Sequence, residues 1–140
     1  MNAADLMTEN PVTLCNDVTV ADAWRTLTSL DVRHLPVVNA RGDLVGMLSD
    51  RDLRALSVPY LVGDEYVGTI AAARDTAVAS LMTGDVLSVT PEADASDIVE
   101  LMLDFKIGAV PVTESDGTLV GIVSYVDVLR QIPFESDAAQ

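Results

Sequence analysis

The chain has 140 residues and a net charge of −14, from 22 acidic residues against seven arginines and one lysine. A negative field of this size repels nucleic acid and anionic membrane surfaces, which argues against both as partners. Cys15 is the only cysteine, so an internal disulfide is excluded. No apolar stretch reaches the roughly 20 residues of a spanning helix, and we expect a cytoplasmic protein without a signal peptide.

The sequence is a tandem repeat. Residues 4–55 align without a gap on residues 79–130, at a constant offset of 75, with thirteen identical positions. Two copies predict a pseudo-symmetric pair that shares one core, because a solenoid needs at least about three repeats. The predicted organisation is a first repeat at 1–56, a connector at 57–76, a second repeat at 77–134 and a flexible tail at 135–140.

Each copy opens with a short helical turn that ends in Met-Thr and packs nearby. An apolar run follows, Val12–Cys15 in the first copy and Val86–Val89 in the second, and predicts a short buried strand. Helix-start residues then precede apolar positions at helical spacing, so one helix is expected in each copy. These start residues are Thr19 with Asp22, and Asp94 with Asp97.

Two further strands and a last helix complete each copy. In the first, His34–Val38 and Leu44–Leu48 flank a turn that contains Gly42, which predicts a β-hairpin. The last helix begins near Ser49 and ends before Pro59, since proline cannot continue a helix interior. The equivalents in the second copy are Ala109–Thr113, Leu119–Val123, Gly117, Ser124 and Pro133. Each repeat is therefore a βαββα unit, and the fold class is α+β.

The connector is longer than usual, and a short helix at Thr69–Ala73 is one explanation. Tyr60 and Tyr66 are expected to be exposed, although they could also fold over a bound ligand. The helix of the second copy carries apolar residues over an arc near 200°, from Ile98 to Phe105. A single core needs a narrower arc, so we expect the surplus face to pack against a second copy in a twofold homodimer.

The local sequence with the most chemical content is Gly-x-x-Ser-x-x-Asp, which begins at Gly46 and again at Gly121. Glycine in a strand indicates close approach of a backbone or a ligand, and serine at a strand-to-helix junction points at a helix N-terminus that favours phosphate. The aspartate can accept hydrogen bonds from both ribose hydroxyls. A purely structural capping pair is the alternative, but its repetition at matched positions favours a nucleotide site.

Three elements occur in order and in tandem: Met-Thr, then His34-Leu35-Pro36-Val37-Val38, then Gly-x-x-Ser-x-x-Asp. Together they resemble the cystathionine beta-synthase (CBS) domain pair, or Bateman module. The resemblance covers nearly the whole chain. It implies two βαββα repeats packed sheet to sheet as one module, and a disc-shaped homodimer. It also implies regulatory binding of an adenosyl compound (AMP, ADP, ATP or S-adenosylmethionine) in clefts between the repeats.

Carried over to this chain, the resemblance implies two clefts. One would be lined by Ser124, Asp127, Thr8, Thr13, Val32 and His34. The other would be lined by Ser49, Arg51, Asp52, Thr83, Ser88, Ile107 and Ala109. The Asp52 cleft ranks first, because Arg51 can meet a phosphate with two hydrogen bonds, whereas its counterpart Val126 cannot.

Two single residues have ordinary structural explanations. His34 has no partner residue at metal-ligand spacing, so a packed histidine or one at the edge of a bound base is expected, and no metal site is predicted. Trp24 lies on the apolar stripe of its helix and is expected in the core or in a dimer contact. No nucleophile is spaced with a base, and no ATPase-type phosphate loop is present, so we do not expect an enzyme.

The leading hypothesis is a sensor that binds an adenosyl ligand and signals to a regulated protein through a change of shape. AMP is favoured because cations are few, and a ligand with more phosphates would need an accompanying Mg²⁺. No cofactor is obligatory. A ligand-free dimeric scaffold for protein interactions is the alternative.

Overall fold

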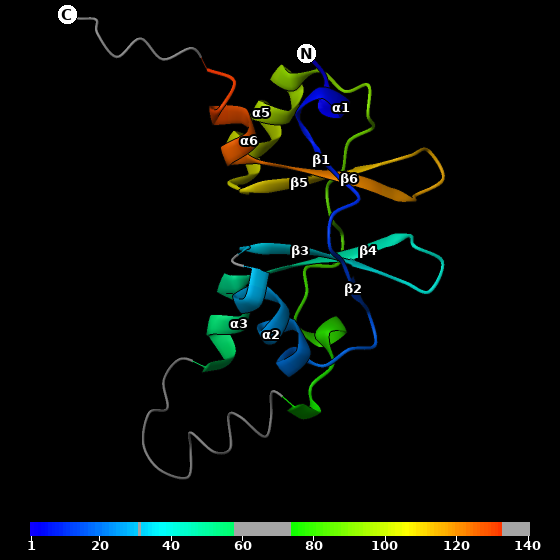
Figure 1. Ribbon diagram of the computed structural model, residues 1–140, viewed down its shortest axis with the longest axis vertical. Helices are drawn as coiled ribbons and strands as arrows, with labels where there is room; N and C mark the ends of the chain where they lie inside the picture. Colours follow the sequence, from blue (N-terminus) through cyan, green and yellow to red (C-terminus); the bar gives the residue numbers. More distant parts are fainter. Residues whose placement is uncertain (31, 58–73, 133–140) are drawn as a thin grey trace, which may run out of the picture. The chain divides into compact units, whose positions relative to one another are not determined.

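The computed structural model describes residues 1–30, 32–57 and 74–132, and these form two compact units (Figure 1). Unit 1 contains Met1–Pro11 and Leu87–Gln140, and unit 2 contains Val12–Val86. The unit boundaries therefore differ from the boundaries of the sequence repeat. The first eleven residues of the chain belong with the second copy, and the segment that leads into the second copy belongs with the first.

Unit 2 is built on a three-stranded sheet in the order β2-β3-β4. Strand β2 pairs parallel with β3 through the crossover helix α2, and β3 pairs antiparallel with β4 as a hairpin. Helix α3 follows β4 directly. The bounds are β2 Leu14–Cys15, α2 Val20–Leu30, β3 His34–Val38, β4 Leu44–Ser49, α3 Asp50–Ser57 and the 3-10 turn η1 Val78–Ser80.

Unit 1 has a three-stranded sheet in the order β1-β6-β5, antiparallel throughout. Its hairpin has the same register as that of unit 2, with Ala109 opposite Ser124 where His34 is opposite Ser49. The bounds are α1 Ala3–Leu6, β1 Thr8–Glu9, α5 Ala95–Phe105, β5 Ala109–Thr113, β6 Leu119–Ser124 and α6 Tyr125–Leu129.

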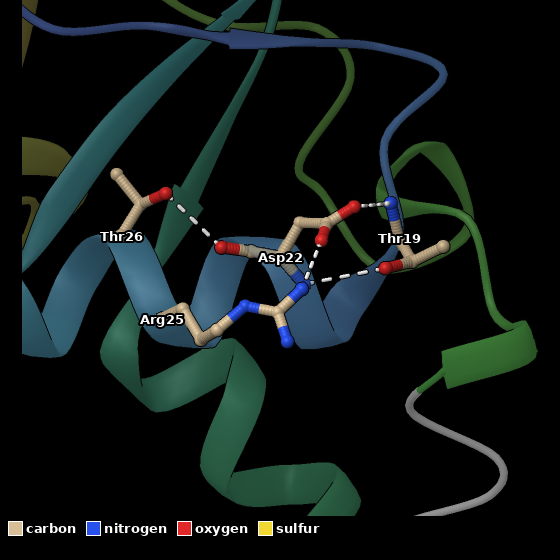
Figure 2. Close-up of polar contacts among 4 residues, drawn as sticks. All are labelled: Thr19, Asp22, Arg25 and Thr26. Atoms are coloured by element: carbon tan, nitrogen blue, oxygen red, sulfur yellow. Dashed lines mark hydrogen bonds and ion pairs between the residues drawn. The ribbon is translucent and has the colours of Figure 1, made fainter.

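The predicted helix starts are confirmed. The backbone N–H of Thr19 donates to Asp22 over 3.3 Å and that of Asp22 donates to the Thr19 hydroxyl over 3.2 Å, while Arg25 forms an ion pair with the same carboxylate (Figure 2). These hydrogen bonds hold the pKa of Asp22 below its ordinary value. In the second copy Asp94 accepts from Ser96 N–H over 3.2 Å. Side-chain acceptors thus satisfy free N–H groups at both helix starts.

Each unit has its own hydrophobic core, and matched positions carry different side chains. Leu35 and Leu48 are fully buried in unit 2, where Val110 and Val123 are buried in unit 1. The rest of the unit 2 core is Leu14, Val20, Ala23, Leu27, Val37, Leu53 and Val78. The rest of the unit 1 core is Ala3, Leu6, Ile98 and Val112. At these two hairpin positions unit 2 therefore buries the larger side chains, whereas at the matched pair Ala23 and Ile98 unit 1 does.

The α+β fold class and the βαββα order are confirmed in the first copy, and both hairpins match the prediction except that β4 and β6 are one residue longer. Both turn glycines have positive φ, 89° at Gly42 and 96° at Gly117, which glycine adopts without strain. The short strand predicted over Val86–Val89 is wrong, because only Val89 bridges to Val112. The strand predicted over Val12–Cys15 is reduced to two residues.

The sequence reading missed β1. Thr8 and Glu9 pair with Ile122 and Gly121 of the second copy, and a single bridge between Thr83 and Met47 is the counterpart in unit 2. Three predictions lie outside the described residues: the short helix at Thr69–Ala73, the exposed Tyr60 and Tyr66, and the flexible tail at 135–140.

Candidate ligand-binding site

The Ser-x-x-Asp group of unit 2 lies where β4 passes into α3. The Ser49 N–H donates to Asp52 Oδ2 over 2.9 Å, and the Asp52 N–H donates to Ser49 Oγ over 3.2 Å. Both side chains are half-buried, and Arg51 between them is exposed. The junction therefore holds a serine and a carboxylate in fixed positions, with a guanidinium on the surface beside them.

Unit 1 repeats this geometry at the junction of β6 and α6. The Ser124 N–H donates to Asp127 Oδ2 over 2.8 Å, the Ser124 hydroxyl donates to the same oxygen over 3.0 Å, and the Asp127 N–H donates back to Ser124 Oγ over 3.4 Å. Val126 stands where unit 2 has Arg51. The two units thus share a backbone arrangement and differ in charge at its surface.

Reciprocal capping, the structural alternative considered from the sequence, is present in both units. The hydrogen bonds of each cap involve only Oδ2 of the aspartate. An ionised carboxylate has two oxygens with about four acceptor positions, so capping leaves acceptor capacity on Oδ1. Capping and ligand binding are therefore compatible at the same residue.

The glycines of the two motifs have a structural explanation that the sequence reading did not find. A Cβ atom at Gly46 would lie 2.9 Å from Cγ of Met82 and closer still to its sulfur. A Cβ atom at Gly121 would lie 2.8 Å from Cγ of Met7, again with the sulfur closer. The close approach that requires glycine is made by a methionine of the other sequence copy, within the same unit.

The threonine after each methionine lies on the same strand surface as the motif serine. Thr83 exchanges both backbone hydrogen bonds with Met47, at 3.0 Å each, and Thr8 is paired with Ile122. Each partner is two residues before the serine, and residues i and i+2 of a strand share a face. The diagonal Cβ separation in such a pair is about 7–8 Å. The structure therefore brings Thr83 near Ser49, and Thr8 near Ser124.

His34 belongs to the Ser49 group within unit 2. It is half-buried and lies directly opposite Ser49 in the hairpin. Burial lowers its pKa below the ordinary value of 6.5, the nearby Asp50 and Asp52 carboxylates oppose this shift, and Arg33 and Arg51 add to it. A neutral imidazole beside Ser49 follows from that balance. Its predicted closeness to Asp127 stays a prediction.

Other predicted site residues are divided between the units. Ala109 is buried opposite Ser124 in unit 1, and Ile107 in the same unit is half-buried. Ser88 is exposed and accepts a hydrogen bond from the Thr113 hydroxyl over 3.3 Å. Thr13 and Val32 belong to unit 2, half-buried and exposed respectively. Each predicted cleft combines residues of both units and therefore stays a prediction.

Charge is distributed unequally between the units. Unit 1 has twelve acidic residues against Lys106 and Arg130, whereas unit 2 has ten acidic residues against six arginines. Trp24 is 46% exposed, so a place in the core is wrong and the predicted alternative, a dimer contact, stays a prediction. Beyond the first residue Met1, four described apolar side chains of unit 1 are also more than half exposed. They are Leu103, Phe105, Leu129 and Ile132.

Two features are absent from the described residues, a metal-binding cluster and a membrane-spanning helix. Over residues 1–30, 32–57 and 74–132 no three His, Cys, Asp or Glu side chains are grouped so as to hold a metal ion. Within the same ranges, none of the helices combines the length and hydrophobicity needed to cross a bilayer.

Two copies of one small α+β fold, each with a Ser-x-x-Asp group at a strand-to-helix junction, define a tandem module. The chain belongs to the CBS domain family, whose model matches residues 3–59 and 78–133. Among solved structures, CBSX2 in complex with AMP is 32% identical with a TM-score of 0.78, over 92% of this chain and 93% of that one. A structure of CBSX2 from Arabidopsis thaliana is 30% identical over 92% of each chain, with a TM-score of 0.79.

Curated relatives include both small and large proteins. A CBS domain-containing protein of Dictyostelium discoideum is 27% identical over 124 residues, which are 89% of this chain and 86% of that protein. The A-adding tRNA nucleotidyltransferase of Aquifex aeolicus is 28% identical over 132 residues, but the chain spans only 14% of that enzyme. It likewise spans 27% of the magnesium transporter MgtE of Thermus thermophilus. In these larger relatives the matched region is a small part.

Proposed function

We propose that the chain is a regulatory sensor that binds an adenosyl compound, with AMP as the favoured ligand, and passes the signal to a partner protein. The proposal rests on one observation, that each unit contains segments of both sequence copies. The Ser-x-x-Asp group of one sequence copy lies on the same strand surface as the Met-Thr threonine of the other copy. A ligand held there would contact both copies, and unequal affinity for two shapes would couple binding to conformation.

The chemistry of the unit 2 group fits a nucleoside monophosphate. The Asp52 carboxylate has unused acceptor capacity for ribose hydroxyls, and the exposed Arg51 guanidinium can donate two hydrogen bonds to phosphate. The neutral His34 imidazole adds no repulsion to a cation and no strong attraction to an anion. With so few cations nearby, one phosphate group is better matched than three, unless Mg²⁺ accompanies the ligand.

The similarity to CBSX2 in complex with AMP supports the same ligand class. The acidic surface of the whole chain favours ligands that bring little negative charge. In this proposal the chain does not catalyse a reaction; it is a regulatory module in the cytoplasm, acts as a homodimer, and changes the activity of a protein whose identity is not part of the proposal.

Calorimetric titration of the chain with AMP tests the proposal. ADP, ATP with Mg²⁺, and S-adenosylmethionine serve as comparison ligands. Saturable binding of AMP that Asp52→Ala abolishes, and that Asp52→Asn partly retains, is the expected result. Absence of heat with all four ligands, from a folded and ligand-free sample, would contradict it.

A ligand-free scaffold is the second candidate, and two observations favour it. The Ser-x-x-Asp groups are already engaged as helix caps, and unit 1 exposes Leu103, Phe105, Leu129 and Ile132. Exposed apolar groups of this kind suit a protein interface. A scaffold would bind its partner equally well with and without AMP, whereas a sensor would not. The same AMP titration, followed by a partner-binding assay with and without AMP, distinguishes the two.

A further inference from the structure

We propose that Met7 and Met82 are positioning residues for the candidate ligand site, which makes this inference rest on the proposed function. Each inserts its side chain over a strand glycine of the other sequence copy, Gly121 or Gly46. This contact sets the strand register that presents the following threonine on the surface of the Ser-x-x-Asp serine. Neither methionine was among the residues that the sequence motifs assign to the ligand.

Side chains alternate between the two faces of β6. Gly121 and Val123 face one side of β6, and Ile122 and Ser124 face the other, because successive side chains point to opposite faces. Val123 is fully buried in the core of unit 1, and Met7 packs against the same core. The core side of β6 is therefore the side on which Gly121 receives Met7.

Thr8 follows Met7 and must point to the opposite side, the one that carries Ser124. It is exposed and is paired with Ile122. Unit 2 repeats the arrangement, with Met82 packed against the core of that unit and Thr83 exposed opposite Met47. Slipping either segment by one residue would put threonine in the core and methionine on the ligand surface.

The space over each glycine is occupied by the methionine side chain. An added Cβ would come within 3 Å of the Met82 side chain at Gly46, and equally close to Met7 at Gly121, so no larger residue fits without displacing the thioether. Thr83 is also held by two 3.0 Å backbone hydrogen bonds that it exchanges with Met47. The half-buried methionine thus supplies the side-chain anchor that fixes the register of this single bridge.

The test compares Met82→Ala with Leu81→Ala. Both residues are half-buried and pack against the unit 2 core, but only Met82 lies over Gly46. Hydrogen exchange of the Thr83 and Met47 amides reports the register without any ligand, and AMP titration reports the site. Met82→Ala should speed exchange at both amides and weaken AMP binding about tenfold, while Leu81→Ala should leave AMP affinity within about twofold of the wild type.

A second set of variants covers the case in which Met82→Ala does not fold. Gly46→Ala should displace Met82 and weaken AMP binding. The single variant Met82→Leu should retain most of the wild-type affinity. The double variant Gly46→Ala/Met82→Ala should bind AMP better than the summed losses of the two single variants predict. Equal loss of affinity in Met82→Ala and Leu81→Ala would overturn the positioning role, as would full affinity after the Thr83 amide has lost its protection.

Failure of the proposed function can be distinguished from failure of the positioning role. If the wild-type chain binds none of the adenosyl ligands, the proposed function fails and the positioning role fails with it. If the wild type binds AMP and the variants do not follow the pattern above, only the positioning role fails.

Discussion

Unit 1 and unit 2 have the same local scaffold and different surroundings. Each has an antiparallel hairpin, a strand-to-helix junction closed by a Ser-x-x-Asp cap, and a methionine over a strand glycine. Yet unit 2 packs leucines where unit 1 packs valines, and it offers Arg51 where unit 1 offers Val126. The comparison teaches that the repeat preserves the residues that set backbone geometry, while core volume and surface charge vary between the copies.

The difference in charge has a direct functional consequence. Unit 1 has ten more acidic than basic residues, and unit 2 has four more. An anionic ligand is therefore disfavoured near the Asp127 group and tolerated near the Asp52 group. We therefore propose that the two groups differ as ligand sites, and the following experiments each test one aspect of the comparison between the units.

The largest expected effect is on stability. Leu48→Ala empties space in the unit 2 core and should lower the free energy of unfolding by about 2–5 kcal/mol. The matched change Val123→Ala removes fewer carbons and should cost roughly 1.5–2.5 kcal/mol. Urea titration monitored by circular dichroism measures both. Equal losses would show that the two cores are equally sensitive and would contradict the comparison.

The affinity for AMP should depend on whether an arginine lies beside the Ser-x-x-Asp group. Arg51→Ala removes charge-assisted hydrogen bonds to phosphate and should weaken AMP binding by about tenfold to a hundredfold, measured by calorimetry. Val126→Arg places a guanidinium at the equivalent position of unit 1 and should strengthen AMP binding there or create it. Unchanged affinity in both variants would remove the basis for ranking the Asp52 group first.

The two caps should have similar, smaller effects. Ser49→Ala and Ser124→Ala each leave an N–H group without its side-chain acceptor and should cost about 1 kcal/mol of stability. Thermal unfolding of each variant without ligand measures this cost. If only the Ser49 variant is destabilised, the cap of the short helix α6 is not a stabilising element.

The smallest expected effect is a pH dependence linked to the histidine of unit 2. Burial lowers the pKa of His34, so the folded chain favours the neutral imidazole, and the unfolded chain binds a proton at higher pH. Stability should therefore fall as the pH drops below the ordinary histidine value of 6.5. His34→Gln should remove this part of the difference between about pH 7.5 and about pH 5.5. The equivalent residue of unit 1, Ala109, cannot titrate. An unchanged pH difference in His34→Gln would contradict a histidine held neutral by burial.

Much of the fold could be predicted from the sequence because local signals are repeated. The hairpins have a two-residue period and glycine turns, and α2 and α5 begin with polar residues that the structure confirms as caps. The strand at Val86–Val89 was wrong because an apolar run does not specify its pairing partner. The packing of Met7 and Met82 over glycines of the other sequence copy was not predicted, because it depends on long-range contacts. The identical Met-Thr and glycine positions of the two copies were the sequence feature that could have indicated it.

The Ser-x-x-Asp groups were located correctly from their spacing, but spacing alone does not separate a cap from a ligand site. The structure adds that the caps engage Oδ2 and that the Met-Thr threonines lie on the same surface. The predicted clefts, each of which combines residues of both units, remain predictions that only ligand binding tests.

Titration of AMP into the wild type, Asp52→Ala and Asp127→Ala is the measurement that tests the central claim most directly. We expect saturable binding by the wild type, loss of that binding in Asp52→Ala, and a smaller change in Asp127→Ala, with all three proteins folded. Equal binding by all three proteins, or binding lost only in Asp127→Ala, would contradict it.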